Sequence, residues 1–505
     1  MKKSLSLILA MLMLASTVTL TACSETGADN SDTGETTQQT ETPSAEGDAE
    51  VEAETEPEDT RASIADDLPE RDFEGRNFTV LGTDESNYGA YIVSEELTGE
   101  VVNDAVYARN LAIEERFNAK IARNSAGTAA DAYTTASTMI KTAAQAGDTE
   151  SFHLVSYHVV EAGGIAVQGY LMNWYDIPYI NFEKPWWSDS TVEDLSMNEH
   201  CFLAVGDAAV SSISQTYCVI YDKDAVKNYD LDDVYTTVRD GKWTVDYLND
   251  ICTIVTLDVD GDGQMTEADY YGLSSSPYSN VNTYLWAFDN QIFTKNSEGV
   301  LEFSYYNERL VNIFDKVYAL FKETNGVWAP VQSDHFVGIN QFKNYGSLFT
   351  NALLSFTTTY LADYEHEYGI SPYPKFDEAQ AEYKTMVDGN HEAMGIAKNA
   401  VDLEFIGIMT EVMCAEAYKQ IIPAYYDVCL KQRYASSPED AEMIELCVDS
   451  RVFDLGYVYD NWKGVSFYME SLINAGNKDI TSHYQKNEKA VTKYYDRVIE
   501  MFYED

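Results

Sequence analysis

Short apolar runs alternate with longer amphipathic segments after residue 76 of the chain. Runs rich in β-branched and aromatic residues predict strands, and segments with apolar residues at helical spacing predict helices. The predicted order is strand 77–82, helix 102–117, strand 120–122, helix 129–146 and strand 151–157. This order is typical of an α/β fold with a parallel sheet. Ligands of such sheets bind at the carboxyl ends of the strands, which points to Asp84, Tyr157 and His158 as candidate ligand-binding residues.

Strands and helices are both predicted after residue 160, and the chain beyond Val401 is mainly helical. An aromatic-rich segment without regular strands covers residues 173–190. Further strands are predicted over 202–207, 217–221 and 353–360, and helices over 242–256, 284–288, 307–321 and 490–502. The sequence shows no repeat of fixed period, which argues against a solenoid or a propeller.

The first 22 residues have the pattern of an export signal. Lys2 and Lys3 precede an uncharged apolar run, and small residues precede Cys23. Residues 20–23, Leu-Thr-Ala-Cys, resemble a bacterial lipobox, whose cysteine receives a diacylglycerol before cleavage. We therefore expect residues 1–22 to be a lipoprotein signal peptide and Cys23 to be lipidated; a plain secretory signal or an N-terminal membrane anchor is the alternative. No other stretch approaches the ~18 uninterrupted apolar residues of a membrane span.

Residues 23–72 are predicted to form a disordered acidic linker. From Ser24 to Thr60 the chain holds thirteen acidic residues, no Lys or Arg and no aromatic residue. Such a segment buries too little apolar surface to offset the entropy of ordering, and its like charges keep it extended. We expect it to act as a spacer that holds a folded region, residues 73–505, away from the lipid.

Composition and charge remove several functional classes. The chain has 33 Lys and Arg against 84 Asp and Glu, which gives a formal net charge of −51. Because nucleic acids and anionic membrane surfaces are bound by clustered positive charge, neither is expected as a partner. Apolar residues make up 45% of the chain, which is enough for a large core. Tyrosine, with 37 copies, suits a surface that meets sugars or peptides, since its ring face is apolar and its tip is polar.

One acidic loop has the spacing of a metal site. Residues 258–269, DVDGDGQMTEAD, place Asp at positions 1, 3, 5 and 12 and Gly at position 6, as in an EF-hand calcium loop. A hard cation needs several oxygens, and alternate residues of a tight loop direct theirs to one point. We expect structural Ca²⁺ here, with a solvated acidic turn as the alternative. The predicted ligands are Asp258, Asp260, Asp262, Gln264 through its carbonyl, Thr266 through water, and Asp269.

Enzyme motifs are mostly absent from the sequence. His366-Glu367 and His391-Glu392 begin strings that resemble HExxH, but both lack the second histidine. No GxSxG elbow, P-loop or GxGxxG occurs, so no catalytic residue is assigned. The six cysteines that follow Cys23 lie among apolar residues and form no CxxC pair. We expect them to be mostly buried free thiols rather than zinc ligands.

Several segments resemble, in the same order, the sequence of one protein family. They are residues 156–174, 217–226, 241–248, 271–273 directly after the acidic loop, and 342–375. With the lipobox and the acidic linker, they are similar to bacterial extracellular solute-binding proteins of ABC importers, in the carbohydrate-binding family. The resemblance covers most of residues 78–460.

The resemblance implies a two-lobed, periplasmic-binding-protein-like (type II) fold with a helical C-terminal part. Its α/β lobes close over the ligand like a hinged clamp. The first lobe would comprise residues 73–216 and 355–400, and the second lobe residues 217–354 and 401–505. Aromatic faces would pack against sugar rings, although any single Trp can equally belong to the core. By position, the implied ligand-binding residues are Asp84, Tyr157, His158, Trp186, Trp187, Trp286, Tyr360 and Trp462.

The implied function is capture of a carbohydrate, an oligosaccharide in our interpretation, in the cleft between the lobes. The monomeric chain, lipid-anchored at the extracellular face of the cell membrane, would deliver its ligand to the permease subunits of an ABC transporter without catalysis. The alternatives are a tethered carbohydrate-active hydrolase, which would need paired carboxylates, and a binding protein of the same fold for a peptide or another small solute. The scarcity of Arg weakens the peptide alternative.

Overall fold

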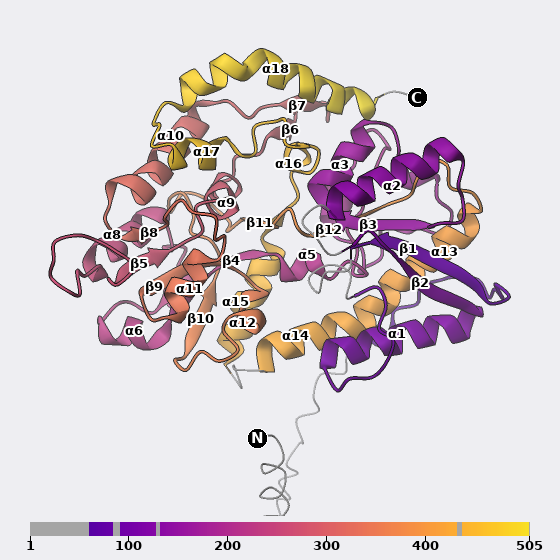
Figure 1. The fold of residues 1–505 in the computed structure, drawn as a ribbon, viewed down its shortest axis with the longest axis horizontal. Coiled ribbons are helices and arrows are strands. Elements are labelled where there is room, and N and C mark those ends of the chain that lie inside the picture. The colour runs from indigo at the N-terminus through magenta and orange to yellow at the C-terminus, as the bar shows by residue number, and fades with distance from the viewer. Residues whose placement is uncertain (1–59, 84–90, 128–131, 432–436, 504–505) are drawn as a thin grey trace, which may run out of the picture. The chain divides into compact units, whose positions relative to one another are not determined.

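The computed structural model describes residues 60–83, 91–127, 132–431 and 437–503. These residues belong to a compact unit that begins at Asp59. The predicted signal peptide, the lipidated Cys23 and the linker up to residue 59 lie outside the described residues. Figure 1 shows two main sheets, one built chiefly from the first third of the chain and one from its middle.

The first sheet holds four strands in the order β12–β3–β1–β2. Strand β1 is parallel to β2 and β3, with Phe78 opposite Ile121, whereas β12 is antiparallel to β3. Helix α1 connects β1 to β2, and α2 connects β2 to β3, so the predicted strand–helix alternation is confirmed. The elements are β1 (Arg76–Gly82), α1 (Val101–Phe117), β2 (Ala119–Ser125), α2 (Ala132–Ala146), β3 (Leu154–His158), α3 (Val159–Val167) and β12 (Glu392–Gly395).

The second sheet holds five strands in the order β10–β4–β9–β5–β8. Strand β9 is parallel to β5 and antiparallel to β4, which in turn is antiparallel to β10. Its helix α8 shows why the local sequence folds as predicted: the Thr244 hydroxyl caps it by accepting from Tyr247 N, and its apolar side faces the core. The elements are β4 (Tyr217–Asp222), α8 (Val245–Val255), β5 (Tyr271–Ser274), β8 (Val327–Trp328), β9 (Ser347–Leu353) and β10 (Tyr368–Ser371).

Two short ladders, β6–β7 and β11–β13, accompany the main sheets. They consist of β6 (Phe293–Lys295), β7 (Leu301–Phe303), β11 (Thr385–Met386) and β13 (Arg451–Val452). The shorter helices up to residue 359 are η1 (Thr60–Ser63), η2 (Trp174–Asp176), α4 (Asp189–Glu193), α5 (Ser211–Ser214), α6 (Lys223–Asn228), α7 (Val234–Arg239), α9 (Ser279–Ala287), α10 (Glu308–Tyr318), η3 (Ala319–Glu323), α11 (Val337–Lys343) and α12 (Phe356–Thr359). The later helices are α13 (Leu403–Glu416), η4 (Ala417–Ile421), α14 (Ile422–Lys431), α15 (Pro438–Asp449), α16 (Leu455–Val458), α17 (Tyr468–Asn474) and α18 (Ile480–Met501).

Two predicted strands differ from the structure. The strand expected over 353–360 ends at Leu353 as β9, and helix α12 follows it. Thr357 and Thr358 direct their hydroxyls to backbone carbonyls of the preceding turn, which favours a tight helical turn over an extended chain. The strand expected over 202–207 is limited to isolated bridges such as Ala204 with Met394, because no continuous partner runs beside it.

Two elements lie with a different sheet from the one that the expected lobe division implies. Strand β10, expected in the first lobe, pairs with β4 in the second sheet. Helix α13, expected in the second lobe, packs Phe405 against Phe78 of the first sheet with ring centroids 5.7 Å apart. The folded region also begins before residue 73, since Leu68 packs against the core and Asp66 forms an ion pair with Arg116.

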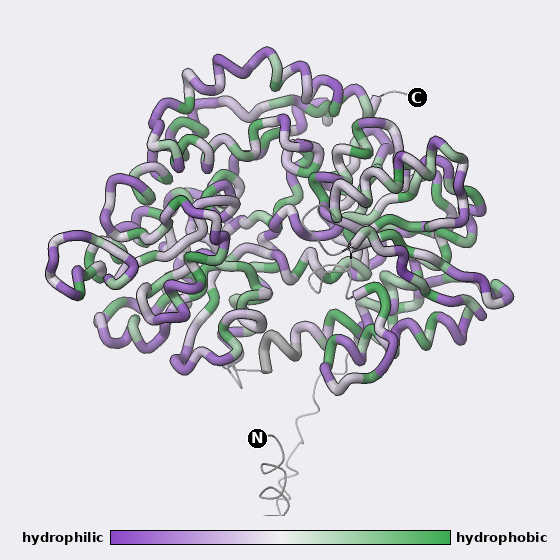
Figure 2. The backbone as a smooth tube through the Cα atoms, viewed as in Figure 1, coloured by the Kyte–Doolittle hydropathy of each residue, from purple (hydrophilic) through white to green (hydrophobic). Residues whose placement is uncertain are grey.

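Helix α18 contacts β7, α10, α17 and α3. Near its start Tyr484 stacks on Tyr306, with ring centroids 4.5 Å apart. At its C-terminal end Phe502 packs against Phe202 and Tyr459. Figure 2 shows hydrophobic residues along both sheets and a largely hydrophilic α18, so this helix covers the core with one face only.

Two further features of the fold are the state of its cysteines and the apolarity of its helices. Five cysteines are buried and free, as predicted: Cys201, Cys218, Cys252, Cys414 and Cys447. The side chain of Cys429 lies outside the described residues. Among the described residues, no helix combines the length and the apolarity that a membrane crossing requires.

Candidate functional site

Two of the predicted ligand residues, Tyr157 and His158, lie in different environments at the carboxyl edge of the first sheet. Tyr157 is fully buried, with its hydroxyl 3.3 Å from Ser137 Oγ, and burial raises its pKa. It is therefore a core residue. His158 ends β3 and stands directly before α3, at the edge of the sheet. Asp84, two residues after β1, lies outside the described residues.

Four buried polar atoms at this edge have no hydrogen-bond partner in the described part of the chain. They are Thr83 Oγ1, His158 Nδ1, His391 Nε2 and Glu392 Oε1. Thr83 follows β1, and Glu392 pairs with His158 across β12 and β3, so the atoms come from adjacent strand ends. Buried polar atoms are nearly always satisfied by protein or water. Their presence together indicates a place where water or a ligand supplies hydrogen bonds.

Burial keeps the titratable members of this group uncharged. Desolvation, followed by the neighbouring His391, lowers the pKa of His158 to about 3. Desolvation lowers the pKa of His391 to about 4 and raises that of Glu392 well above its usual range. At neutral pH this edge of the first sheet therefore offers polar groups without charge.

Aromatic rings flank His158 on two sides. The ring centroid of Tyr133 lies 4.6 Å from that of His158, and the centroid of Trp462 lies 5.9 Å away. Trp462 is 55% exposed and has a positive φ of 59°, which is uncommon for a bulky residue. Its ring stacks on Phe467 at 4.8 Å, and its Nε1–H donates to Glu161 Oε1 at 3.0 Å. These contacts hold a largely exposed indole in a fixed orientation.

A turn formed by residues 388–391, here the central turn, connects this edge with the second sheet. Tyr133 Oη donates to Asn390 Oδ1 at 3.3 Å, and Asn390 N donates to Asp388 Oδ1 at 3.0 Å. The other oxygen of Asp388 accepts from the hydroxyl of Tyr217, at the start of β4. Burial raises the pKa of Asp388, and the hydrogen bonds that it accepts from Tyr217 and Asn390 oppose this effect. The central turn therefore lies beside groups from both sheets.

The second sheet contributes aromatic pairs at its own carboxyl edge. Tyr278 follows β5 and stacks on His335 at 4.1 Å. Tyr360, directly after α12, stacks on Phe336 at 5.1 Å and is half-buried. Of the residues implied by the family resemblance, the structure thus places His158 and Trp462 together, with Tyr360 on the other sheet.

Three other predicted tryptophans lie in the core instead. The Nε1–H groups of Trp186 and Trp187 donate to the two oxygens of Glu411, both at 2.9 Å. Trp286 Nε1 donates to Asp454 Oδ2 at 2.9 Å. All three indoles are buried, and a buried ring offers no face to a sugar. The structure removes these three residues from the candidate site.

The predicted calcium loop lies between α8 and β5. One carboxylate oxygen from each of Asp258, Asp260 and Asp262 lies within 4.8 Å of the other two. Asp258 accepts from Gly263 N at 2.8 Å, and Asp269 is held by backbone N–H groups, chiefly that of Thr266, which lower its pKa. Three converging carboxylates in a preformed turn fit a hard cation. Calcium binding by this loop stays a prediction.

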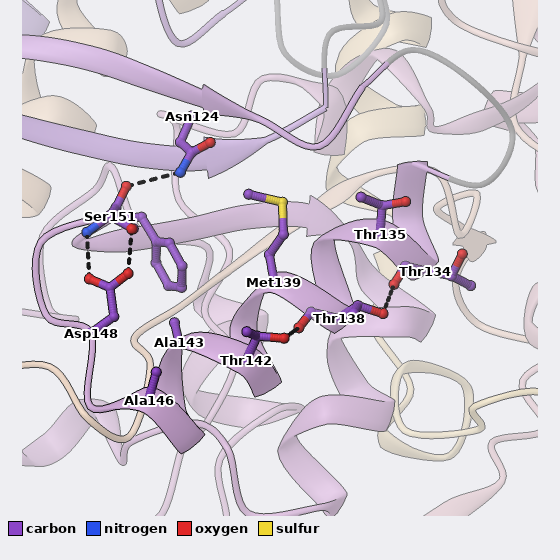
Figure 3. Close-up of a pocket in the computed structure, with 11 residues that line it drawn as sticks. Asn124, Thr134, Thr135, Thr138, Met139, Thr142, Ala143, Ala146, Asp148 and Ser151 are labelled. Atoms are coloured by element: carbon purple, nitrogen blue, oxygen red, sulfur yellow. Dashed lines mark hydrogen bonds between the residues drawn. The ribbon is translucent and has the colours of Figure 1, made fainter.

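A separate cavity of about 420 Å³ lies along α2. Figure 3 shows Met139 projecting from α2 toward the pair formed by Asn124 and Ser151, which are joined by a hydrogen bond of 3.0 Å. The hydroxyls of Thr138 and Thr142 donate to carbonyls of their own helix. This cavity offers few free polar groups and includes none of the site residues named above.

Sequence reasoning missed Tyr133, Asp388 and Asn390. A signal for the central turn is present in the sequence: Asp388-Gly389-Asn390 is a polar turn directly after the apolar Met386-Val387, of the type that loops use for binding. The sequence marks His391 only as the first residue of a motif that lacks the second histidine of HExxH. Tyr133 carries no signal in the sequence, because only the packing of α2 against β3 brings it to His158.

Comparison with known proteins gives the same picture of the fold. No protein-family model and no curated protein matches the chain. Solved structures do. UspC of M. tuberculosis has a TM-score of 0.55 at 13% identity and covers 83% of this chain and 100% of its own. An ABC substrate-binding protein from Listeria monocytogenes in complex with cycloalternan has a TM-score of 0.53 at 12% identity, covering 85% and 100%.

The GacH receptor of Streptomyces glaucescens, solved without ligand and in complex with acarbose, has a TM-score of 0.51 at 12% identity and covers 85% of this chain and 99% of its own. At such identities the likeness concerns the backbone. The predicted two-lobed α/β architecture is thus confirmed, and the chain has the fold of the periplasmic-binding-protein-like substrate-binding proteins of ABC transporters.

Proposed function

We propose that this protein captures a carbohydrate between its two sheets and delivers it to an ABC transporter. The finer proposal is an oligosaccharide ligand and a lipid anchor at Cys23 on the extracellular face of the membrane. The fold supports the class of function, since solved structures of this fold include a complex with cycloalternan and one with acarbose. Binding without catalysis is part of the proposal.

The observation that carries this proposal is the setting of Trp462. An exposed indole, fixed by Glu161 and Phe467, stands beside His158 and other buried polar atoms without partners. A sugar ring has an apolar CH face, which packs on an aromatic ring, and hydroxyls, which need polar partners. The candidate site supplies both types of contact within one cluster.

The experiment is a thermal-shift screen of the full chain against neutral mono- and oligosaccharides and short peptides, followed by calorimetry on the hits. We expect saturable binding of a saccharide and a rise of Tm that grows with its concentration. Stabilisation by peptides with no response to any saccharide would refute carbohydrate capture. Release of the aryl group from aryl-glycosides would refute binding without catalysis and support a hydrolase.

A further inference from the structure

A histidine and two aspartates meet at the C-terminal end of β4. Asp222 is the last residue of β4, Asp224 lies in the first turn of α6, and His366 stands two residues before β10. Because β10 pairs with β4 through Tyr368 and Asp222, the chain brings His366 beside the carboxylates. One ligand-type atom from each of the three residues lies within 4.8 Å of the other two. Tyr217, which contacts the central turn, begins β4, so this cluster and the candidate site lie at opposite ends of the strand.

Neighbouring groups hold the side chains of this cluster in place. His366 Nδ1 lies 2.7 Å from Asp222 Oδ2, which also accepts from the hydroxyl of Tyr364 at 2.9 Å. The other oxygen of Asp222 accepts from Ala225 N at 2.8 Å. The His366 ring packs on Tyr345, with ring centroids 4.4 Å apart. Metal ligands are commonly oriented by hydrogen bonds of this kind. A metal ion would replace only the contact between His366 and Asp222.

The buried carboxylate of Asp222 lacks a permanently charged partner. Its side chain is 6% exposed, and its sole ion-pair partner in the described part of the chain is His366, whose imidazole is charged only when protonated. Lys227 pairs with Asp224 at 3.5 Å and with Glu367 at 3.8 Å, but it does so at the surface, where solvent screens such contacts. Buried charges in proteins are usually paired or coordinate a metal. A cation held by the cluster would supply the missing positive charge.

We propose that Asp222, Asp224 and His366 bind a zinc ion. The inference goes beyond the proposed carbohydrate capture and does not depend on it. One imidazole nitrogen with two carboxylate oxygens suits zinc, whereas calcium and magnesium prefer oxygen ligands. Ligand atoms around one zinc ion lie about 3.4 Å apart, so a spread of up to 4.8 Å closes by small side-chain rotations. Nδ1 of His366 would bind the metal as neutral imidazole with its proton on Nε2, the two carboxylates would balance the charge of the ion, and water would complete the coordination.

The test is calorimetry and equilibrium dialysis of the metal-free full chain with zinc. We expect zinc to bind with a Kd in the micromolar range or below and to resist displacement by calcium in large excess. Tyr364→Phe removes a hydrogen bond that orients Asp222 and should weaken zinc binding about tenfold. His366→Gln and Asp224→Asn each remove a ligand and should weaken it further. Both side chains are partly exposed, 44% and 43%, so we expect these two variants to fold.

Two matched variants separate this site from other places where zinc can bind. Asp258→Ala combined with Asp262→Ala removes carboxylates of the acidic loop and should leave zinc binding intact. His200→Gln removes a histidine whose Nδ1 contacts the carbonyl of Asn198 rather than a carboxylate, and should also leave it intact. Absence of zinc binding at micromolar concentrations, or equal zinc affinity and stoichiometry in His366→Gln and the native chain, would overturn the inference. Displacement of the bound zinc by an equal concentration of calcium would overturn the assignment of a nitrogen ligand.

Discussion

Replacement of Trp462 by Ala should raise the Kd of the ligand by a factor that follows from the exposed area of the indole. The residue is 55% exposed. If a free Trp side chain offers about 250 Å², then about 140 Å² is accessible, and a sugar stacked on one face would cover about 70 Å² of it. At about 25 cal/mol per Å² this is roughly 1.7 kcal/mol, or about a 15- to 20-fold increase in Kd.

The assay is calorimetry with a saccharide found in the screen. Trp462→Phe keeps an aromatic face but loses the hydrogen bond to Glu161, so we expect a smaller loss of affinity. Tyr175→Ala removes another exposed aromatic ring, 45% exposed in η2, and should leave Kd unchanged. Near-native Tm values for all variants would exclude unfolding as the cause. An unaltered Kd for Trp462→Ala would refute the assignment of this indole as the sugar platform.

Four further predictions concern stability and the linker. Calcium at a hundredfold excess over Kd should stabilise the native chain by about 2.7 kcal/mol and raise its Tm. Asp258→Ala combined with Asp262→Ala should abolish this rise. Identical melting curves of the native chain in calcium and in chelator would contradict calcium binding. Glu411→Ala leaves two buried indole N–H groups unpaired and should lower the free energy of unfolding, measured in urea, by about 2–4 kcal/mol. A loss below about 1 kcal/mol would argue against the pairing of Glu411 with the two indoles. Because burial raises the pKa of Glu411 to about 7, the folded chain binds more protons than the unfolded chain between pH 4.5 and 7. The contribution of protonated Glu411 to the free energy of unfolding is therefore lost as pH rises through 7. Glu411→Gln should flatten the Tm–pH curve between pH 4.5 and 7. Deletion of residues 24–60 should leave ligand affinity unchanged, as calorimetry on the shortened chain would show.

The sequence was informative where a pattern is local. The period of apolar residues and the Thr244 cap are sufficient to predict α8, and the β-rich run before Gly82 predicts β1. The partners of β10 and α13 depend instead on where the chain crosses between the sheets, which no local pattern records. For this reason the sheet partners of β10 and α13 were not predicted, whereas the strand–helix order of the first sheet was.

The same difference between local patterns and non-local contacts decides which residues of the candidate site can be predicted from the sequence. Trp residues could be found by type, but type does not separate Trp462, which is exposed, from Trp186 and Trp187, whose N–H groups find Glu411 more than 220 residues away. A buried acceptor so distant in sequence determines which indoles are buried.

Helix α18 has a consequence for how the two sheets can move. Its 22 residues form a rod of about 33 Å. The rod contacts α10 and β7 on one side and α3 on the other, and Asn198 Nδ2 also donates to the carbonyl of Phe502 at its end (Figure 1). A rigid strut attached to both halves fixes the separation of its attachment points. If the ligand is captured between the two sheets as proposed, we expect opening to be a rotation about an axis near α18, with the greatest displacement at the margin farthest from the helix.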